Sequence, residues 1–175
     1  MDEAVAVSPV RGHRRSFQGM EFVAIDFETT AFDDGGASEP WQLGWARVVD
    51  LEVVETREWF FDVEGAPARA HAADALGTLA GSFEIWSPYL LARRLVAHNL
   101  ACERTILTRV APLTKWGPWV DTLRLAKARY PKLPGYTLSE LCEIFGCVPQ
   151  LEGRTWHDGL YDAVACANLA IRLAQ

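Results

Sequence analysis

Residues 21–28 of the sequence read EFVAIDFE, a nearly continuous run of apolar and β-branched residues that ends in acidic side chains. Such a run is typical of a strand that is covered on both faces, so we expect residues 21–27 to form a central strand. Side chains alternate along a strand, and Asp26 and Glu28 therefore point to the same face. Carboxylates placed there are unfavourable to desolvate unless a cation compensates them. The alternative is that the strand ends at Asp26 and both acids are solvated.

The rest of the chain predicts a mixed sheet around this strand. Four further strands are expected, at residues 41–49, 51–63, 94–97 and 119–121. Helices are expected at residues 83–92, 100–110 and 123–130, from the capping box Thr137–Glu140 to Gly146, and at about 158–173. The Ala- and Gly-rich segment 64–83 is expected to be a loop with helical pieces. Three strands followed by alternating helices and strands indicate an α/β fold, with a mixed five-stranded sheet and helices on both faces.

Length and composition restrict the class of protein. A chain of 175 residues has the size of one domain, which we expect to span residues 20–175 after a flexible tail over residues 1–19. The sequence contains no apolar run near the ~18 residues of a membrane span and no secretory signal, so we expect no membrane partner. The four cysteines show neither CxxC pairs nor zinc-ligand spacing, which is typical of reduced thiols in a cytoplasmic protein.

The charge distribution is uneven. A net charge of −6 argues against a strong non-specific nucleic-acid binder. Residues 93–132, however, contain nine Lys and Arg residues against only two acids, Glu103 and Asp121. This stretch could meet a polyanion while the remainder of the chain repels it or holds cations. The alternative is a solvated helical face.

Two further acids fall on apolar helical faces. Positions 100, 103, 107 and 110 form one stripe in which only Glu103 is charged. Asp162 shares a face with Cys166, Leu169 and Leu173 near the start of the last helix. Together with Asp26 and Glu28 they could converge on divalent cations, and oxygen ligands select Mg²⁺ or Mn²⁺ over zinc. The alternative for Glu103 is a salt bridge. The alternative for Asp162 is that the positive N-terminal end of the helix dipole stabilises its carboxylate.

His157 lies five residues before Asp162, about 140° round a helix, so the two cannot share a helical face. We expect His157 in the loop that leads into the last helix. From there an imidazole can reach a water molecule on a metal ion. A lone histidine of this kind is otherwise a surface residue or a helix cap.

Three stretches, in this order, resemble the motifs of the DEDDh (DnaQ-like) 3′–5′ exonucleases. They are DFETT at 26–30, VAHNLACE at 96–103 and HDGLYDA at 157–163. The segments DTL (121–123), YP (130–131) and YTLSELC (136–142) between the last two also follow the family. The resemblance covers about residues 20–174, and three motifs in order are far more specific than any one of them.

The resemblance implies a ribonuclease H-like fold, and two-metal hydrolysis of the 3′-terminal phosphodiester that releases nucleoside monophosphates. Asp26, Glu28, Glu103 and Asp162 would bind two cations, Mg²⁺ or Mn²⁺, and His157 would be the general base. Further residues would bind the substrate: the backbone N–H groups of Thr29 and Thr30, the aromatic ring of Phe32, and His98 and Asn99 of the second motif. Phe32 could equally anchor its loop on the core.

Two features depart from the family. Its second motif normally ends in Asp, and here Glu103 moves the carboxylate by about 1.5 Å, enough to disturb a tight Mg²⁺ site unless the helix retreats or Mn²⁺ is preferred. The His-Gly-Ile-type element of many relatives has no clean match. We therefore assign no role to His71, which is expected at the surface, and none to Trp156.

The leading hypothesis is a metal-dependent 3′–5′ exonuclease that acts on single-stranded DNA or RNA 3′ ends, with DNA favoured. Association with a DNA polymerase, in proofreading or repair, is compatible with it, and a stand-alone enzyme is favoured. The alternative from another class is a non-catalytic nucleic-acid-binding or polymerase-associated module in which Glu103 marks decay. A third option is an oligoribonuclease-like enzyme for short RNA.

Overall fold

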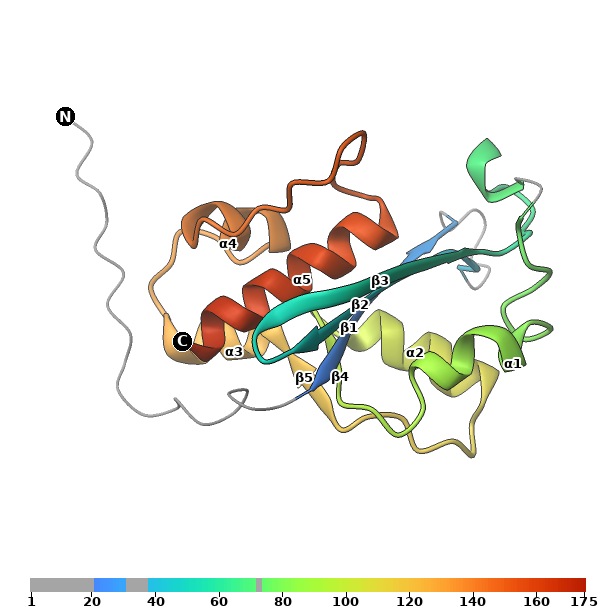
Figure 1. Ribbon diagram of the computed structural model, residues 1–175, viewed down its shortest axis with the longest axis horizontal. Coiled ribbons are helices and arrows are strands. Elements are labelled where there is room, and N and C mark those ends of the chain that lie inside the picture. Colours follow the sequence, from blue (N-terminus) through green and yellow to red (C-terminus); the bar gives the residue numbers. More distant parts are fainter. Residues whose placement is uncertain (1–20, 31–37, 72–73) are drawn as a thin grey trace.

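The computed structural model describes residues 21–30, 38–71 and 74–175, and its centre is a five-stranded sheet (Figure 1). The strands are β1 (Phe22–Thr29), β2 (Pro40–Val49), β3 (Glu52–Phe60), β4 (Leu95–Ala97) and β5 (Trp119–Asp121). Their order is β3-β2-β1-β4-β5, with antiparallel pairing among β1, β2 and β3 and parallel pairing of β4 with β1 and of β5 with β4. The predicted fold class is confirmed. The predicted tail over residues 1–19 lies outside the described residues.

Helices cover both faces of the sheet. They are η1 (Ala68–His71), α1 (Phe83–Trp86), η2 (Ser87–Tyr89), α2 (Ala101–Val110), α3 (Thr122–Arg129), α4 (Leu138–Ile144) and α5 (Gly159–Ala174). Helix α5 lies along one face, flanked by α3 and α4, and α1 and α2 lie on the other (Figure 1). The helix expected at 83–92 is shorter than predicted, since a 3-10 turn follows Trp86. Pro88 is the second residue of that turn and has no backbone N–H to continue an α-helix.

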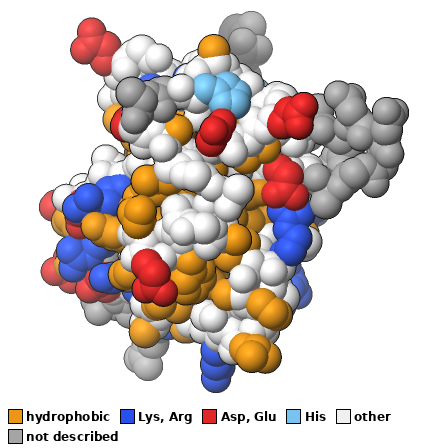
Figure 2. All heavy atoms as spheres, turned by 90° about the vertical axis from the view of Figure 1, so that its right-hand side faces the viewer, with side chains coloured by type: hydrophobic (Ala, Val, Ile, Leu, Met, Phe, Trp, Pro, Cys, Tyr) orange, Lys and Arg blue, Asp and Glu red, His pale blue; other side chains and the backbone are white. Residues whose placement is uncertain are grey.

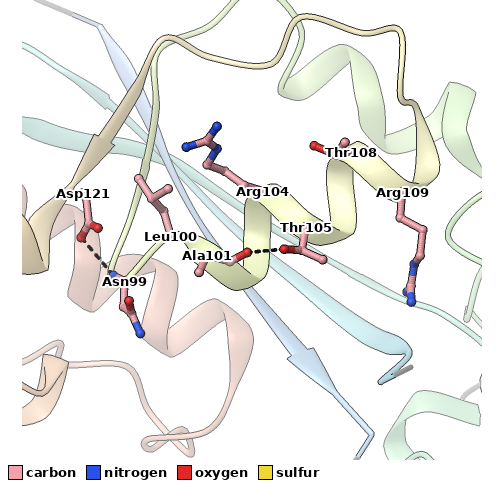
Figure 3. Close-up of a pocket in the computed structure, with 8 residues that line it drawn as sticks. All are labelled: Asn99, Leu100, Ala101, Arg104, Thr105, Thr108, Arg109 and Asp121. Atoms are coloured by element: carbon pink, nitrogen blue, oxygen red, sulfur yellow. Dashed lines mark hydrogen bonds between the residues drawn. The ribbon is translucent and has the colours of Figure 1, made fainter. Parts of the chain in front are cut away.

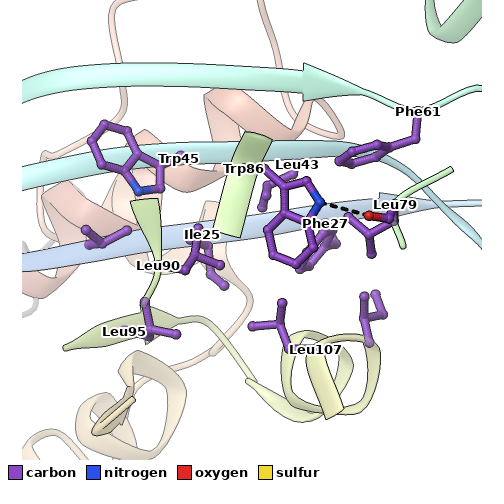
Figure 4. Packing of buried hydrophobic residues seen from close by; sticks show 12 residues of the cluster. Ile25, Phe27, Leu43, Trp45, Phe61, Leu79, Trp86, Leu90, Leu95 and Leu107 are labelled. Carbon is purple, nitrogen blue, oxygen red and sulfur yellow. Dashed lines mark hydrogen bonds between the residues drawn. The ribbon is translucent and has the colours of Figure 1, made fainter. Parts of the chain in front are cut away.

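Alternation along β1 decides which side chains meet which helices. Val23, Ile25 and Phe27 enter the cluster shared with α1 and α2, where the Trp86 indole donates to the Leu79 carbonyl at 2.9 Å (Figure 4). Phe22 and Ala24 pack in the cluster that contains residues of α5. Asp26 and Glu28 continue the second set, so both carboxylates lie on the α5 face of the sheet.

Two glycines allow the first turn of α5 to approach β2 closely. Gly44 is the β2 partner of Asp26, and a Cβ atom at Gly44 would lie 1.8 Å from the carbonyl oxygen of Gly159. The Gly159 N–H donates to the buried Gln42 side chain at 3.1 Å. Only glycine permits this approach, which brings the start of α5 next to Asp26.

Acidic and basic side chains are mixed on the described surface at the end of the molecule that carries α1. Figure 2 shows hydrophobic side chains gathered in the middle of this face, with basic groups at its sides and acidic groups among them. Within the described residues, no helix has the length and apolar character needed to cross a membrane. All four cysteines are free thiols.

Candidate active site

Acidic side chains from three separated elements gather at the carboxyl end of β1. Ligand atoms of Glu28, His157 and Asp162 lie within 4.8 Å of one another. Asp26, from the same strand as Glu28, interacts electrostatically with Glu103 of α2 and with Asp162. The structure therefore brings together all five residues that the sequence singled out as catalytic.

Glu103 is buried, and no described basic side chain forms an ion pair with it. Its side chain is 4% exposed and its Oε2 atom has no hydrogen-bond partner. Burial raises the pKa of Glu103 to about 7, although backbone groups of Glu103 and Phe27 oppose the rise. No ion pair reaches this carboxylate in the part of the chain that is described, so the salt bridge considered from the sequence does not form there.

Asp162, in the first turn of α5, is likewise a buried acid with one unpaired carboxylate oxygen. One carboxylate oxygen accepts the His157 backbone N–H at 3.1 Å, and the other, Oδ1, is buried without a partner. Burial raises the pKa of Asp162 to about 6. Burial also raises the pKa of Asp26 well above its usual value, and the charges of Glu103 and Asp162 add to the rise.

This set of groups fits a divalent cation. Two buried oxygen atoms lack hydrogen-bond partners, and the charges of Glu103, Asp162 and Glu28 raise the pKa of Asp26. Burial raises the pKa of Glu28 as well, although His157 and Arg69 oppose the effect. A donor set made of carboxylate oxygens suits Mg²⁺ or Mn²⁺ better than the softer metals.

His157 lies in the loop before α5, as predicted, with an exposed side chain and a positive φ of 66°. The next residue, Asp158, is the N-cap of α5 and accepts the N–H groups of Leu160 and Tyr161. The Arg69 guanidinium donates to the His157 carbonyl at 3.2 Å and to Asp158 at 2.9 Å. Hydrogen bonds on both sides thus fix the backbone that carries the imidazole.

A polar network that the sequence did not predict holds the loop of His157 against β2 and β3. Arg154 donates to Asp158 at 2.8 Å and to both carboxylate oxygens of Glu58, on β3. Glu58 also accepts from the Gln42 side chain at 2.9 Å, and Gln42 accepts the N–H of Gly159. The network links β2 and β3 to the first turn of α5.

Two of the predicted substrate-binding residues already form hydrogen bonds within the protein. Both ring nitrogens of His98 are engaged, one with the Thr122 hydroxyl at 2.9 Å and one with the Tyr136 carbonyl at 3.0 Å, and its substrate-binding role stays a prediction. The Thr30 N–H donates to the Glu39 carbonyl at 2.9 Å and is not free for a nucleotide, contrary to the expectation.

The other substrate candidates remain predictions. Thr29 is the last residue of β1, and Asn99 is exposed, with its backbone held by Asp121 at 3.1 Å. Phe32 lies outside the described residues. The two residues left without a role have surface and packing contacts: His71 pairs with Asp62 at 2.7 Å, and Trp156 packs edge-on against Tyr161.

Comparisons with known proteins agree with this geometry. Residues 56–170 match the family model described as exonuclease, of the RNase T type. No curated protein matches the chain. Among solved structures, exonuclease X in complex with 5′ overhanging duplex DNA is 22% identical, over 87% of this chain and 90% of that one, with a TM-score of 0.65.

Two further structures share the fold. The nuclease domain of 3′hExo, a DEDDh family member bound to rAMP, is 17% identical over 90% of this chain and 92% of that one, with a TM-score of 0.65. E. coli exonuclease I in complex with a dT13 oligonucleotide is 18% identical over 86% of this chain and 40% of that one, with a TM-score of 0.62. These structures share the predicted fold, and the family model confirms the predicted exonuclease family. This chain belongs to the exonuclease family.

Proposed function

We propose that this protein removes nucleotides one at a time from the 3′ end of single-stranded nucleic acid, with DNA the favoured substrate. The observation that supports this most strongly is the carboxylate cluster, in which Glu103 Oε2 and Asp162 Oδ1 are buried without partners. Buried acids with raised pKa values and no cationic partner are unfavourable in a structural role, and they are typical of sites that hold a cation.

The positions of these side chains indicate their roles. Asp26, Glu28, Glu103 and Asp162 would hold two divalent cations, Mg²⁺ or Mn²⁺. When bound, such cations lower the pKa of a coordinated water molecule and offset the negative charge that develops on the phosphate. The protein contributes the fixed geometry, because β1, α2 and α5 are held together by the core and by the approach of Gly44 to Gly159.

His157 would accept the proton of the attacking water. Its side chain is exposed and reaches the metal-ligand cluster, with ligand atoms within 4.8 Å of those of Glu28 and Asp162. A neutral imidazole nitrogen can accept a proton and therefore suits a general base at that point. The Arg69 and Asp162 contacts to its backbone hold the side chain on the site.

A cleavage time course tests the proposal. We expect 5′-labelled single-stranded DNA to give a ladder that shortens by one nucleotide, and 3′-labelled DNA to release a labelled mononucleotide, in Mg²⁺ or Mn²⁺ but not in EDTA. Parallel RNA substrates decide the sugar preference. Asp26→Asn should abolish the ladder. Asp50→Asn, at the exposed turn between β2 and β3, removes the same charge away from the site and should retain it.

Intact strands with both metals would contradict the proposal. If the wild type and Asp26→Asn then bound the strand equally well, the protein would be a non-catalytic nucleic-acid-binding module. A role in proofreading or repair beside a DNA polymerase in the cytoplasm belongs to the same proposal, and co-purification of a polymerase with the tagged full chain tests it.

A further inference from the structure

An open groove of about 630 Å³ follows the exposed side of α2 (Figure 3). It begins at Asn99 and Asp121, at the carboxyl ends of β4 and β5, and extends along the helix to Arg109. The carboxyl end of β1, which carries Asp26 and Glu28, lies at the same edge of the sheet because β1 and β4 are parallel. The groove is therefore adjacent to the candidate active site.

The helix presents an alanine and two threonines between two arginines. At 100° per residue, Ala101, Thr105 and Thr108 form the middle of the exposed face, and Arg104 and Arg109 form its two edges. Both arginines are exposed. Arg109 donates to Glu39 at 3.2 Å, whereas Arg104 forms no ion pair with any residue that the structure describes.

One edge of this face lies next to the carboxylate cluster and to the end of β1. Cys102 is on the same edge of α2 as Arg109, and the next residue, Glu103, belongs to the cluster. Arg109 also contacts Glu39, the residue that pairs with Thr30 just after β1. One edge of the groove thus borders both the cluster and the end of β1.

The chemistry of the lining indicates what the groove holds. Arginine offers several N–H donors in a planar fork that matches phosphate, and the threonine hydroxyls can add hydrogen bonds. Among the described residues, no aromatic side chain lines the groove, so the described lining offers hydrogen-bond donors rather than a stacking surface for bases. These donors suit a sugar–phosphate backbone, on a protein whose net charge of −6 would otherwise repel one.

We propose that this groove holds the backbone of the strand next to its 3′-terminal nucleotide, with Arg104 and Arg109 contacting phosphates. The direction of the strand in the groove rests on the proposed exonuclease function. The groove accounts for only part of the basic segment 93–132. Arg93 pairs with Glu21 and Lys127 lies over the Tyr136 ring, so these two cations are already engaged.

The test measures strand binding separately from cleavage. Binding of a fluorescent single-stranded ten-nucleotide DNA is titrated in Ca²⁺ at several salt concentrations, with the full-length wild type, Arg104→Ala, Arg104→Lys and Arg172→Ala. Arg172 is an exposed arginine in the last turn of α5 and serves as the matched control for net charge. Hydrolysis of the ten-nucleotide strand and of a dinucleotide is then compared in Mg²⁺.

We expect Arg104→Ala to weaken binding about three- to tenfold and to lower the slope of log affinity against log salt by about 0.7, the value for one lost phosphate contact on a single strand. The ratio of kcat/KM for the long strand to that for the dinucleotide should fall by a similar factor. Arg104→Lys should recover most of the slope because it retains the charge, and Arg172→Ala should match the wild type.

Equal binding and equal salt slopes for Arg104→Ala and Arg172→Ala would overturn the groove proposal, whether or not the wild type cleaves. A wild type that binds in this way but never shortens the strand would leave the groove standing and remove the exonuclease function. Failure of the two proposals is therefore distinguishable.

Discussion

Glu103 should destabilise the metal-free protein, and its replacement by glutamine should reveal by how much. The carboxylate is buried, one of its oxygens has no partner, and its pKa rises from 4.5 to about 7 on folding. A group whose pKa is higher in the folded state binds more protons there than in the unfolded chain between these two values. The free energy of unfolding of the wild type therefore falls as the pH rises through this window.

The magnitude follows from the same shift. At ~1.4 kcal/mol for each tenfold change in proton affinity, Glu103 should lower the free energy of unfolding by about 3 kcal/mol between pH 4 and pH 8. Glu103→Gln removes this effect. The buried amide brings its own hydrogen-bonding penalty, but that penalty does not depend on pH. The free energy of unfolding of the variant, relative to that of the wild type, should thus increase by about 3 kcal/mol as the pH rises from 4 to 8.

Urea unfolding followed by tryptophan fluorescence, in EDTA from pH 4 to pH 8, measures this difference. Glu143→Gln, at an exposed position of α4, serves as the control for the loss of one charge. Saturating Mg²⁺ or Mn²⁺ at pH 8 should reverse the order, since a cation held by the cluster stabilises the wild type and binds the variant weakly. A difference that is flat with pH, or that metal does not change, would refute the claim that Glu103 is a buried acid built for a cation.

Four further substitutions test separate parts of the site. Gly44→Ala should lower metal-dependent cleavage at least ~100-fold, since its Cβ would meet the Gly159 carbonyl at 1.8 Å, whereas Gly77→Ala, where a Cβ meets nothing within 4 Å, should retain wild-type rates. His157→Asn should reduce kcat by about 10²- to 10⁴-fold while calorimetry still detects Mn²⁺ binding, and loss of that binding would contradict its role as base. Arg154→Met should destabilise the fold by about 1–2 kcal/mol in urea and lower kcat more than it changes KM, because the loop that carries the imidazole loses its anchor on Glu58. Thr137→Ala removes a capping box and should lower stability by about 1 kcal/mol without changing cleavage, so a loss of activity would show unexpected coupling of α4 to the site.

Patterns within single elements predicted the framework of the site. The apolar run at residues 21–27 identified β1 as a central strand, and alternation placed Asp26 and Glu28 on one face. The stripe along the helix that became α2 indicated that Glu103 would be buried. These predictions succeed because they depend on periodicity, which is a property of each element alone.

Contacts between distant segments were beyond the sequence patterns. Nothing local to Gly44 indicates that the first turn of α5 packs on it, and Arg154 meets Glu58 across 96 positions of the chain. The hydrogen bonds of His98 were not predicted for the same reason, because its partners Thr122 and Tyr136 come from other segments of the chain. A histidine inside a catalytic-looking motif has no sequence signal that separates a substrate contact from a buried structural one.

A crystal grown with Mn²⁺ tests the central claim most directly, through the anomalous scattering of the metal. The account predicts two anomalous peaks at the carboxylate cluster, within about 2.0–2.4 Å of oxygens of Asp26, Glu28 and Asp162. A map without a peak there, with these carboxylates directed away from one another, would contradict it.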